Sequence, residues 1–468
     1  MATLSSWVDR AQSPEGTSTG KGAGADVNPH EVHDVLAGSM LVDAFPMVLD
    51  TAKSHGSWLV DARDGTEYLD MYTFFASSPL GMSPAGLADD PEFRALLAEV
   101  ASNKPANSDM VSVQLAEFVA TFRRVLGDPE LPRLFFIEGG ALAVENALKC
   151  AFDWKSRRNE QAGRSPDLGT SVLHLRQAFH GRSGYTLSLT NTDPIKVDRY
   201  PKFAWPRIDT PVMRFPLEAH REELELAERA ALEQAEAAFR ADPHGIACFV
   251  AEPIQCEGGD NHLSAGFLHS MQELCYRYDA LFILDEVQTG VGVTGTPWCY
   301  QQLGLEPDVV AFGKKVQLGG IMAGRRVAEV EDNVFNVSGR INSTWGGNLT
   351  DMVRSRRLLE IIERTGAFEN AAKVGSHLVD RLVRLADQFP RLVDNARGRG
   401  LLCAIDLPST SQRDRVIIET REDEHVILLA CGKNSIRFRP SLAVTEAEID
   451  LAVDALARVL AGHDGGAR

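Results

Sequence analysis

Residues 308–320 read DVVAFGKKVQLGG, where an apolar run meets a glycine, two adjacent lysines and then a glycine pair. Lysine is among the residues least often buried, so two lysines at the end of an apolar strand need an explanation. One explanation is a solvated turn. The other is a catalytic amine at the end of a buried strand. The dipeptide alone does not distinguish the two, nor does it say whether Lys314 or Lys315 would react.

Apolar stretches of strand length recur through the middle of the chain, with helical patterns such as 266–279 between several of them. Such alternation is typical of βαβ units, so we predict an α/β fold with a mostly parallel central sheet. Ligands of these sheets bind at the carboxyl ends of the strands, where the two lysines lie. The candidate strands are 133–137, 171–175, 246–254, 281–286 and 308–312.

The flanks of this region differ from it in pattern. Residues 1–27 are rich in Ser, Gly, Ala and Thr, which predicts a disordered tail. We expect 28–75 to pack with a small domain and 76–345 to form the large domain, because 468 residues exceed one ordinary core. From 346 to 468, long helices, short strands and a closing helix predict a smaller α/β domain.

Short local signals support these elements. Asn28 followed by Pro29 predicts the start of a helix. The pair at 64–65, Asp-Gly, lies between two strand-like runs and predicts a hairpin. Thr445 and Glu448 form a capping box for the closing helix.

Composition excludes several functions. The formal net charge of −17 argues against a nucleic-acid partner. No apolar stretch is long enough to span a bilayer, so we expect no membrane partner, and the N-terminus lacks a secretory signal pattern. The seven cysteines are scattered without a C-x-x-C motif, which indicates neither a metal site nor disulfides and favours a reducing cytoplasm.

Three other stretches carry chemical groups at strand ends or at a helix start. LFILDEVQTG (281–290) places Asp285 after four apolar residues, and EGGALAVENALK (138–149) reads as a strand end, a glycine turn and a helix. AFHGRSG (178–184) places Phe179 and an arginine at another strand end. Taken singly, these stretches fit a capping acid, a helix that begins with glycine, and a core phenylalanine beside a surface arginine.

Together with a lysine, the same groups match the needs of pyridoxal 5′-phosphate. A lysine amine bonds to the aldehyde, and a carboxylate keeps the pyridine nitrogen protonated so that the ring withdraws electrons. A helix N-terminus receives the phosphate, and an aromatic side chain stacks on the ring. The combination predicts this cofactor.

From about residue 30 onward, the chain resembles the class III (ω-) aminotransferases, which are pyridoxal-phosphate enzymes of fold type I. DEVQTG (285–290) and FGKK (312–315) are specific matches to their motifs. NKPANSD (103–109), STWGGN (343–348) and SIRFRP (435–440) most resemble the L-lysine 6-aminotransferase subgroup. The 4-aminobutyrate aminotransferases share much of this pattern, including FHGR.

The resemblance bears on the choice between the two lysines. Counting back from the glycine pair favours Lys315, whereas the spacing from Asp285 and the likeness to members with two lysines favour Lys314. We therefore expect Lys314, directly after Gly313, to be the lysine that bonds to the cofactor.

The resemblance also implies the other cofactor contacts. Asp285 would pair with the pyridine nitrogen, and the remaining residues would contact the ring and the phosphate. Phe179 and Val287 would pack on opposite ring faces, Gln288 would reach the ring hydroxyl, Gly140 and Ala141 would give backbone N–H groups to the phosphate, and Thr344 would complete the phosphate site from the partner subunit. A homodimer with shared active sites follows from that role of Thr344.

For the substrates, the resemblance implies two arginines with separate tasks, since arginine binds carboxylates with two parallel donors. Arg182 would hold the carboxylate far from the reacting amine, and Arg437 the α-carboxylate of L-glutamate or 2-oxoglutarate. Glu257 would pair with Arg437 when no α-carboxylate is present, and Phe75 would line the donor pocket. Cys256 stands before that acid where glycine is more usual, and a positive φ would be costly for cysteine.

The implied reaction moves the ε-amino group of L-lysine to 2-oxoglutarate. The products would be L-glutamate and 2-aminoadipate 6-semialdehyde, which cyclises to piperideine-6-carboxylate. The alternative is 4-aminobutyrate or another ω-amino acid as donor, because these enzymes differ only in the pocket. A pyridoxal-phosphate-binding regulator without turnover would need neither Arg182 nor Arg437.

Overall fold

The computed structural model describes residues 27–465, so the predicted tail lies outside the described residues except for Val27. Asn28 caps the first turn as predicted, because its side chain accepts a hydrogen bond from the backbone N–H of His30 at 3.0 Å. The predicted hairpin is confirmed by the antiparallel pairing of β1 (Trp58–Val60) with β2 (Glu67–Asp70).

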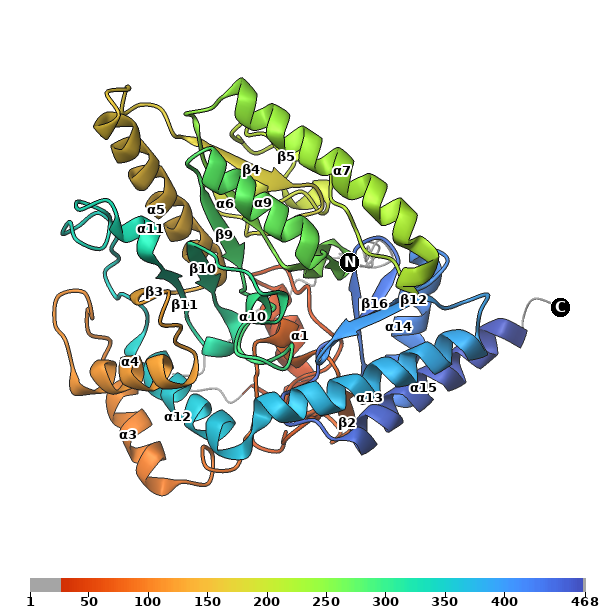
Figure 1. The fold of residues 1–468 in the computed structure, drawn as a ribbon. Coiled ribbons are helices and arrows are strands. Elements are labelled where there is room, and N and C mark those ends of the chain that lie inside the picture. Colours follow the sequence, from red (N-terminus) through yellow and green to blue (C-terminus); the bar gives the residue numbers. More distant parts are fainter. Residues whose placement is uncertain (1–26, 466–468) are drawn as a thin grey trace.

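A seven-stranded sheet forms the centre of the molecule (Figure 1). Its strand order is β3-β11-β10-β9-β6-β4-β5, and β11 alone runs antiparallel to its neighbours. This confirms the prediction of a mostly parallel sheet and the presence of all five predicted strands, but the strand predicted over 246–254 ends at Ala251, and 254–255 belongs to a separate two-stranded sheet. The strands are β3 (Arg133–Ile137), β4 (Ser171–Leu175), β5 (Arg207–Ile208), β6 (Ile246–Ala251), β9 (Leu281–Asp285), β10 (Val309–Phe312) and β11 (Gly319–Ala323).

Helices cover both faces of this sheet, which explains why its strands are apolar without alternation. In β9, Leu281 and Ile283 pack in one apolar cluster with α5 (Gly140–Gln161). Phe282 packs in the other cluster, with α9 (Ala265–Arg277). Because helices cover the strands on both faces, polar side chains gather at the ends of the strands.

The C-terminal part contains a second, antiparallel sheet in the order β12-β13-β16-β15, packed against α13. The predicted capping box is confirmed, because the Thr445 hydroxyl and the Glu448 carboxylate each bond the other residue. The elements are α12 (Leu349–Thr365), α13 (Ala367–Gln388), β12 (Asp394–Arg399), β13 (Leu402–Asp406), α14 (Thr410–Glu424), β14 (Val426–Ile427), β15 (Leu429–Cys431), β16 (Ser435–Phe438) and α15 (Glu446–Gly465).

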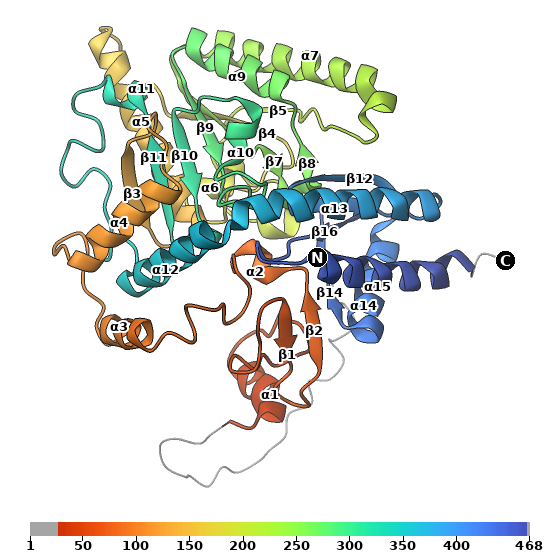
Figure 2. The ribbon, with the colours of Figure 1, turned by 60° about the horizontal axis from the view of Figure 1, so that its bottom comes forward.

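Strand β2 of the N-terminal hairpin pairs in parallel with β14 of the C-terminal part, and the two lie side by side in Figure 2. This pairing supports our proposal that 28–75 packs with a small domain beginning near 346. The remaining elements are short connections or outer helices. They are η1 (Pro29–Glu31), α1 (Val32–Ala37), α2 (Thr73–Ala76), α3 (Pro91–Ala101), α4 (Val113–Val125), α6 (Thr186–Leu189), η2 (Pro194–Lys196), α7 (Leu217–Ala241), β7 (Ile254–Gln255), α8 (Cys256–Gly259), β8 (Asn261–His262), α10 (Cys299–Leu303), η3 (Lys314–Val316) and α11 (Arg325–Ala328).

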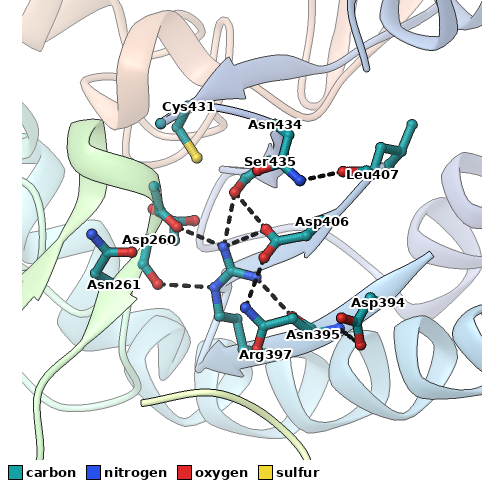
Figure 3. A network of polar contacts seen from close by, with 12 residues as sticks. Asp260, Asn261, Asp394, Asn395, Arg397, Asp406, Leu407, Cys431, Asn434 and Ser435 are labelled. Atoms are coloured by element: carbon teal, nitrogen blue, oxygen red, sulfur yellow. Dashed lines mark hydrogen bonds and ion pairs between the residues drawn. The ribbon is translucent and has the colours of Figure 1, made fainter. Parts of the chain in front are cut away.

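A buried arginine joins the C-terminal sheet to the segment that follows β7 (Figure 3). The Arg397 guanidinium of β12 donates to the carbonyls of Gly259 at 2.6 Å and Asp260 at 3.0 Å. It also donates to the Asp406 carboxylate at 2.9 Å and the Ser435 hydroxyl at 3.0 Å. The segment after β7 is therefore anchored to the C-terminal sheet. Within residues 27–465, no helix is long and apolar enough to cross a membrane.

Candidate active site

The two lysines of the opening stretch have different surroundings. Strand β10 ends at Phe312, and Lys314 adopts a positive φ of 52° directly after Gly313. The Lys314 Nζ donates to the carbonyl of Phe75 at 3.0 Å and lies 5.7 Å from the centre of the Phe75 ring, a side chain that is 43% exposed. The buried Lys315 Nζ instead donates to the backbone carbonyl of Gln288 at 2.8 Å. Of the two amines, Lys314 lies beside an exposed side chain.

Both amines lose protons more easily than an ordinary lysine. Burial, followed by the positive charge of Arg437, lowers the pKa of Lys314 to about 8. Burial, followed by the charge of Lys314, lowers the pKa of Lys315 to about 7. The pKa values therefore do not identify the reactive amine, and only the surroundings of the two side chains distinguish them.

A left-handed turn at 73–76 holds the lysine loop. Its four residues, Thr73 to Ala76, have φ between 43° and 61°, a conformation that costs L-residues roughly 1–2 kcal/mol each. The Thr73 hydroxyl donates to the carbonyl of Arg439 at 2.7 Å, and the Ser77 carbonyl accepts from the side-chain amide of Gln317 at 2.7 Å. The family resemblance implied that Phe75 lines the donor pocket, but nothing in the sequence predicted this left-handed conformation.

Asp285, at the end of β9, lies in a buried polar pair. Its Oδ2 is 2.8 Å from Nδ1 of His180, and its Oδ1 accepts from the backbone N–H of Val287 at 3.0 Å. The other ring nitrogen of His180 is buried and has no hydrogen-bond partner among the described residues. This histidine belongs to the AFHGRSG stretch, in which the sequence alone indicates no role for it, and its contact with Asp285 is seen only in the structure.

A second buried acid lies next to Asp285. Burial raises the pKa of Glu252 well above its usual range, and the negative charge of Asp285 adds to this effect. Glu252 Oε1 accepts from the backbone N–H of Phe179 at 2.9 Å. Glu252 thus favours its protonated form and ties Phe179 to the strand ends.

Helix α5 begins without a side-chain cap. Gly139, at the N-cap, has φ 86°, and no side chain in the part of the chain that the structure describes accepts from the N–H groups of the first turn. A Cβ on Gly140 would lie 2.7 Å from a methyl group of Val287, so the loops after β3 and β9 nearly touch. A Cβ on Gly181 would lie 2.6 Å from the Cβ of Ala141. The start of α5 therefore lies against Val287 and against Gly181, two residues after Phe179.

Glu257 and Arg437 form the ion pair that the sequence predicted. Glu257 Oε2 is 3.0 Å from Nη2 of Arg437, a side chain that is only 2% exposed. Burial alone would raise the pKa of Glu257, but the charges of Arg437 and Lys196 outweigh it and lower that pKa. Lys196 is a residue that sequence reasoning missed, and its Nζ is 2.5 Å from Glu257 Oε1.

Cys256 does not adopt the positive φ that would be costly for a cysteine. Cys256 is buried at the start of α8 and has no positive φ. The positive values fall instead on Gly259 (129°) and Asp260 (50°). Cysteine is therefore accommodated without strain in this segment.

Arg439 contacts two neighbouring polar side chains in the interior. Its fully buried guanidinium pairs with Asp260 and donates to Gln288 Oε1 at 3.2 Å. Gln288 is thus held from the side of β16. The predicted substrate arginine Arg182 is exposed and has no side-chain hydrogen bond or ion pair within residues 27–465. Thr344 is exposed as well, and its carbonyl accepts from the Ser108 hydroxyl at 3.0 Å.

These groups match the chemistry of pyridoxal 5′-phosphate. The uncapped start of the 22-residue helix α5 suits a phosphate, and the buried Asp285 suits a protonated ring nitrogen. Lys314 supplies an amine whose pKa lies near neutrality. Arg437 lies close by, with its guanidinium carbon 5.8 Å from the centre of the Phe75 ring.

Comparison with known proteins agrees with this chemistry. Residues 40–460 match the family model described as aminotransferase class-III. The chain is 60% identical over 438 residues to an L-lysine-epsilon aminotransferase of Mycobacterium tuberculosis, covering 94% of this chain and 97% of that protein. It is 58% identical over 441 residues to the L-lysine-epsilon aminotransferase of Amycolatopsis lactamdurans, covering 94% of this chain and 97% of that protein.

A solved structure extends the likeness to the fold. The lysine aminotransferase from M. tuberculosis in the internal aldimine form superposes with a TM-score of 0.91 and 60% identity, covering 93% of this chain and 100% of that one. The predicted α/β architecture of fold type I is thereby confirmed. On the family match and these identities, the chain belongs to the class III aminotransferases.

Proposed function

We propose that this chain is an L-lysine 6-aminotransferase that uses pyridoxal 5′-phosphate. It transfers the ε-amino group of L-lysine to 2-oxoglutarate and releases L-glutamate and 2-aminoadipate 6-semialdehyde, which cyclises to piperideine-6-carboxylate. The observation that carries this proposal is the 60% identity to an L-lysine-epsilon aminotransferase over 94% of the chain. The buried pair of Glu257 and Arg437 adds a chemical reason, developed below.

When bound, the cofactor supplies an electron sink for the carbon that carries the amino group. Asp285 would pair with its ring nitrogen, and His180 holds the Asp285 carboxylate in position. Phe179 and Val287 are the candidates for the two ring faces. The N–H groups at 140–141 and the Thr344 hydroxyl are the candidates for the phosphate.

Lys314 is our choice for the attachment and proton-transfer lysine. Its Nζ lies beside Phe75 and within the field of Arg437, whereas the Nζ of Lys315 is buried against backbone carbonyls. A pKa of about 8 leaves a useful fraction of Lys314 neutral near physiological pH. The neutral Nζ would take a proton from the ε-carbon of lysine and deliver it to the cofactor within the same half-reaction. In the second half-reaction it would carry out the reverse transfer and place a proton on the α-carbon of glutamate.

The enzyme must accept two unlike donors in one site. Lysine presents its ε-amine with no carboxylate on the reacting carbon, while glutamate presents an α-carboxylate that Arg437 binds. A buried arginine left without a partner costs roughly 3–5 kcal/mol, and Glu257 removes this cost during the lysine half-reaction. Glu257 then moves away when glutamate or 2-oxoglutarate enters. Arg182 holds the distal carboxylate in both halves.

The proposal includes a homodimer with shared active sites in a reducing cytoplasm. Met110, Val111 and Val113 are 70–86% exposed, and Trp345 is 41% exposed. The Ser108–Thr344 hydrogen bond joins the segments that carry them. Exposed apolar groups gathered in this way are typical of an interface, and an interface here would place Thr344 next to a second subunit. Light scattering of the purified protein measures the assembly directly.

The function is tested by offering purified holoenzyme L-lysine, L-ornithine or 4-aminobutyrate separately and following the cofactor absorbance. Lysine should convert the enzyme fastest, and added 2-oxoglutarate should restore the original spectrum. The cyclic product is identified by mass spectrometry. Faster conversion by 4-aminobutyrate than by lysine would overturn the choice of donor while leaving the family assignment intact.

A further inference from the structure

A buried lysine outside every sequence motif contacts the carboxylate of Glu257. Lys196 ends the short turn η2 and is 8% exposed. Its backbone N–H donates to the carbonyl of Asp193 at 3.1 Å, and the Asp193 side chain accepts from the N–H of Ile195 at 3.1 Å. Lysine is almost never buried unless it is paired, and the partner here is Glu257 Oε1 at 2.5 Å.

Glu257 therefore lies between two cations. One carboxylate oxygen faces Lys196 and the other faces Arg437 at 3.0 Å. The Lys196 Nζ is also 5.4 Å from the centre of the Phe179 ring, which places it at the edge of the candidate cofactor site. The three charged groups sum to one positive charge, so the cluster remains attractive to a substrate carboxylate.

We propose that Lys196 is a positioning residue that keeps Glu257 paired while the α-carboxylate of glutamate or 2-oxoglutarate occupies Arg437. This inference rests on the function proposed above. A buried carboxylate that loses its last hydrogen-bond partner carries a large desolvation penalty. A carboxylate that keeps one partner avoids most of that penalty. Lys196 gives Glu257 a second cation to remain with, so the carboxylate pivots about Lys196 and releases Arg437.

The lysine half-reaction needs no such release. In the lysine half-reaction Glu257 remains paired with Arg437, so the contact of Lys196 with Glu257 is only a second one. The loss of Lys196 should therefore damage one half-reaction more than the other. A residue that only supported the local fold would damage both.

The test replaces Lys196 with methionine, an unbranched apolar side chain of similar length. The first readout is the dissociation constant of glutarate, an inert dicarboxylate, measured by calorimetry on the holoenzyme. We expect Lys196→Met to weaken glutarate binding by at least about tenfold, the scale of one charge-assisted hydrogen bond. The lysine half-reaction should change by less than about threefold, and Lys196→Arg should retain both properties.

A double substitution separates this role from simple attraction of anions. In a Glu257→Gln background no carboxylate has to be kept paired, so Lys196→Met should then change the glutarate dissociation constant by less than about threefold. An equal loss in both backgrounds would mean that Lys196 acts on the anion directly and would overturn the proposal. Equal slowing of both half-reactions, or no change in glutarate binding, would overturn it as well.

Lys202→Met is the matched control. Lys202 follows in the same connecting segment, and its Nζ donates to the carbonyl of Val197 at 2.9 Å instead of to Glu257. It should leave glutarate binding unchanged. If the holoenzyme did not react with lysine but Lys196→Met still weakened glutarate binding, only the proposed amino donor would be rejected. A normal lysine reaction without the glutarate effect would reject the role of Lys196 alone.

Discussion

Replacing Glu257 with glutamine is expected to separate the two half-reactions. Glutamine keeps the size and an acceptor oxygen but removes the charge that faces Arg437. The lysine half-reaction should slow, because Arg437 then lacks its ionic partner while lysine is bound. The glutamate half-reaction should be unchanged or faster, because no acid has to leave before the α-carboxylate binds.

The contact at Arg437 sets the size of this effect. Two unit charges 3.0 Å apart interact by roughly 5–6 kcal/mol at an effective dielectric constant of about 20. Glu257 is 21% exposed, its carboxylate is shared with Lys196, and glutamine keeps a dipole, so only part of that energy is lost. We expect a net loss of about 2 kcal/mol, which is about a 30-fold slower lysine half-reaction.

Single-turnover kinetics measure each half alone. Holoenzyme is mixed rapidly with saturating lysine, or the amino form of the enzyme with 2-oxoglutarate, and the cofactor absorbance is followed. Glu424→Gln is the matched control. Glu424 forms an ion pair with Arg458 at 2.6 Å on the surface, and its loss should alter neither rate. Equal slowing of both halves by Glu257→Gln would refute the exchange and return Glu257 to a structural role.

Four other outcomes are expected. Lys314→Ala should abolish covalent attachment of the cofactor and multiple turnover, whereas Lys315→Ala should retain attachment; borohydride reduction and peptide mapping identify the labelled lysine, and a label on Lys315 would reverse the assignment. Since attachment requires the neutral amine and the pKa of Lys314 is lowered to about 8, loading of apoenzyme should accelerate with rising pH up to about 8 and level off above it; a pH-independent rate contradicts this. Asp285→Ala should bind the cofactor yet lose at least about a thousandfold in turnover, because the buried carboxylate acts mainly on the transition state, and near-normal turnover would rule out its pairing with the ring nitrogen. Thr344→Ala should weaken cofactor binding by roughly 1.5–3 kcal/mol, and mixing it with Lys314→Ala should restore activity if Thr344 serves the partner's site; no recovery after confirmed subunit exchange places it in its own subunit's site.

Local sequence patterns predicted the bounds of those strands whose structure depends mainly on their own residues. Strands β3 and β4 have the predicted bounds, and β9 and β10 each end within one residue of prediction. Their continuous apolar runs are typical of strands that are buried on both faces, so the pattern predicts a strand directly. The same patterns missed β11 (Gly319–Ala323), because its first two glycines resemble a turn and its antiparallel pairing with β3 is a long-range contact.

The left-handed turn at 73–76 shows why such long-range contacts escape sequence reasoning. Nothing in the letters TFFA favours positive φ, and each residue pays a steric cost there. Contacts from Arg439 and Gln317, which lie hundreds of residues away in the chain, hold the turn in place. Strain of this kind persists only where the surrounding structure enforces it, and such sites cluster around functional residues.

The sequence by itself determined the α/β architecture, the cofactor chemistry and, through its family likeness, the pairing of Glu257 with Arg437. These depend on residue types in local patterns and motifs. Only the tertiary structure decided that Lys314 lies beside Phe75, that His180 holds Asp285 and that Lys196 is the second partner of Glu257. Each of these contacts joins strand ends or loops that are distant in the chain, and the order of strands in the folded sheet brings them together.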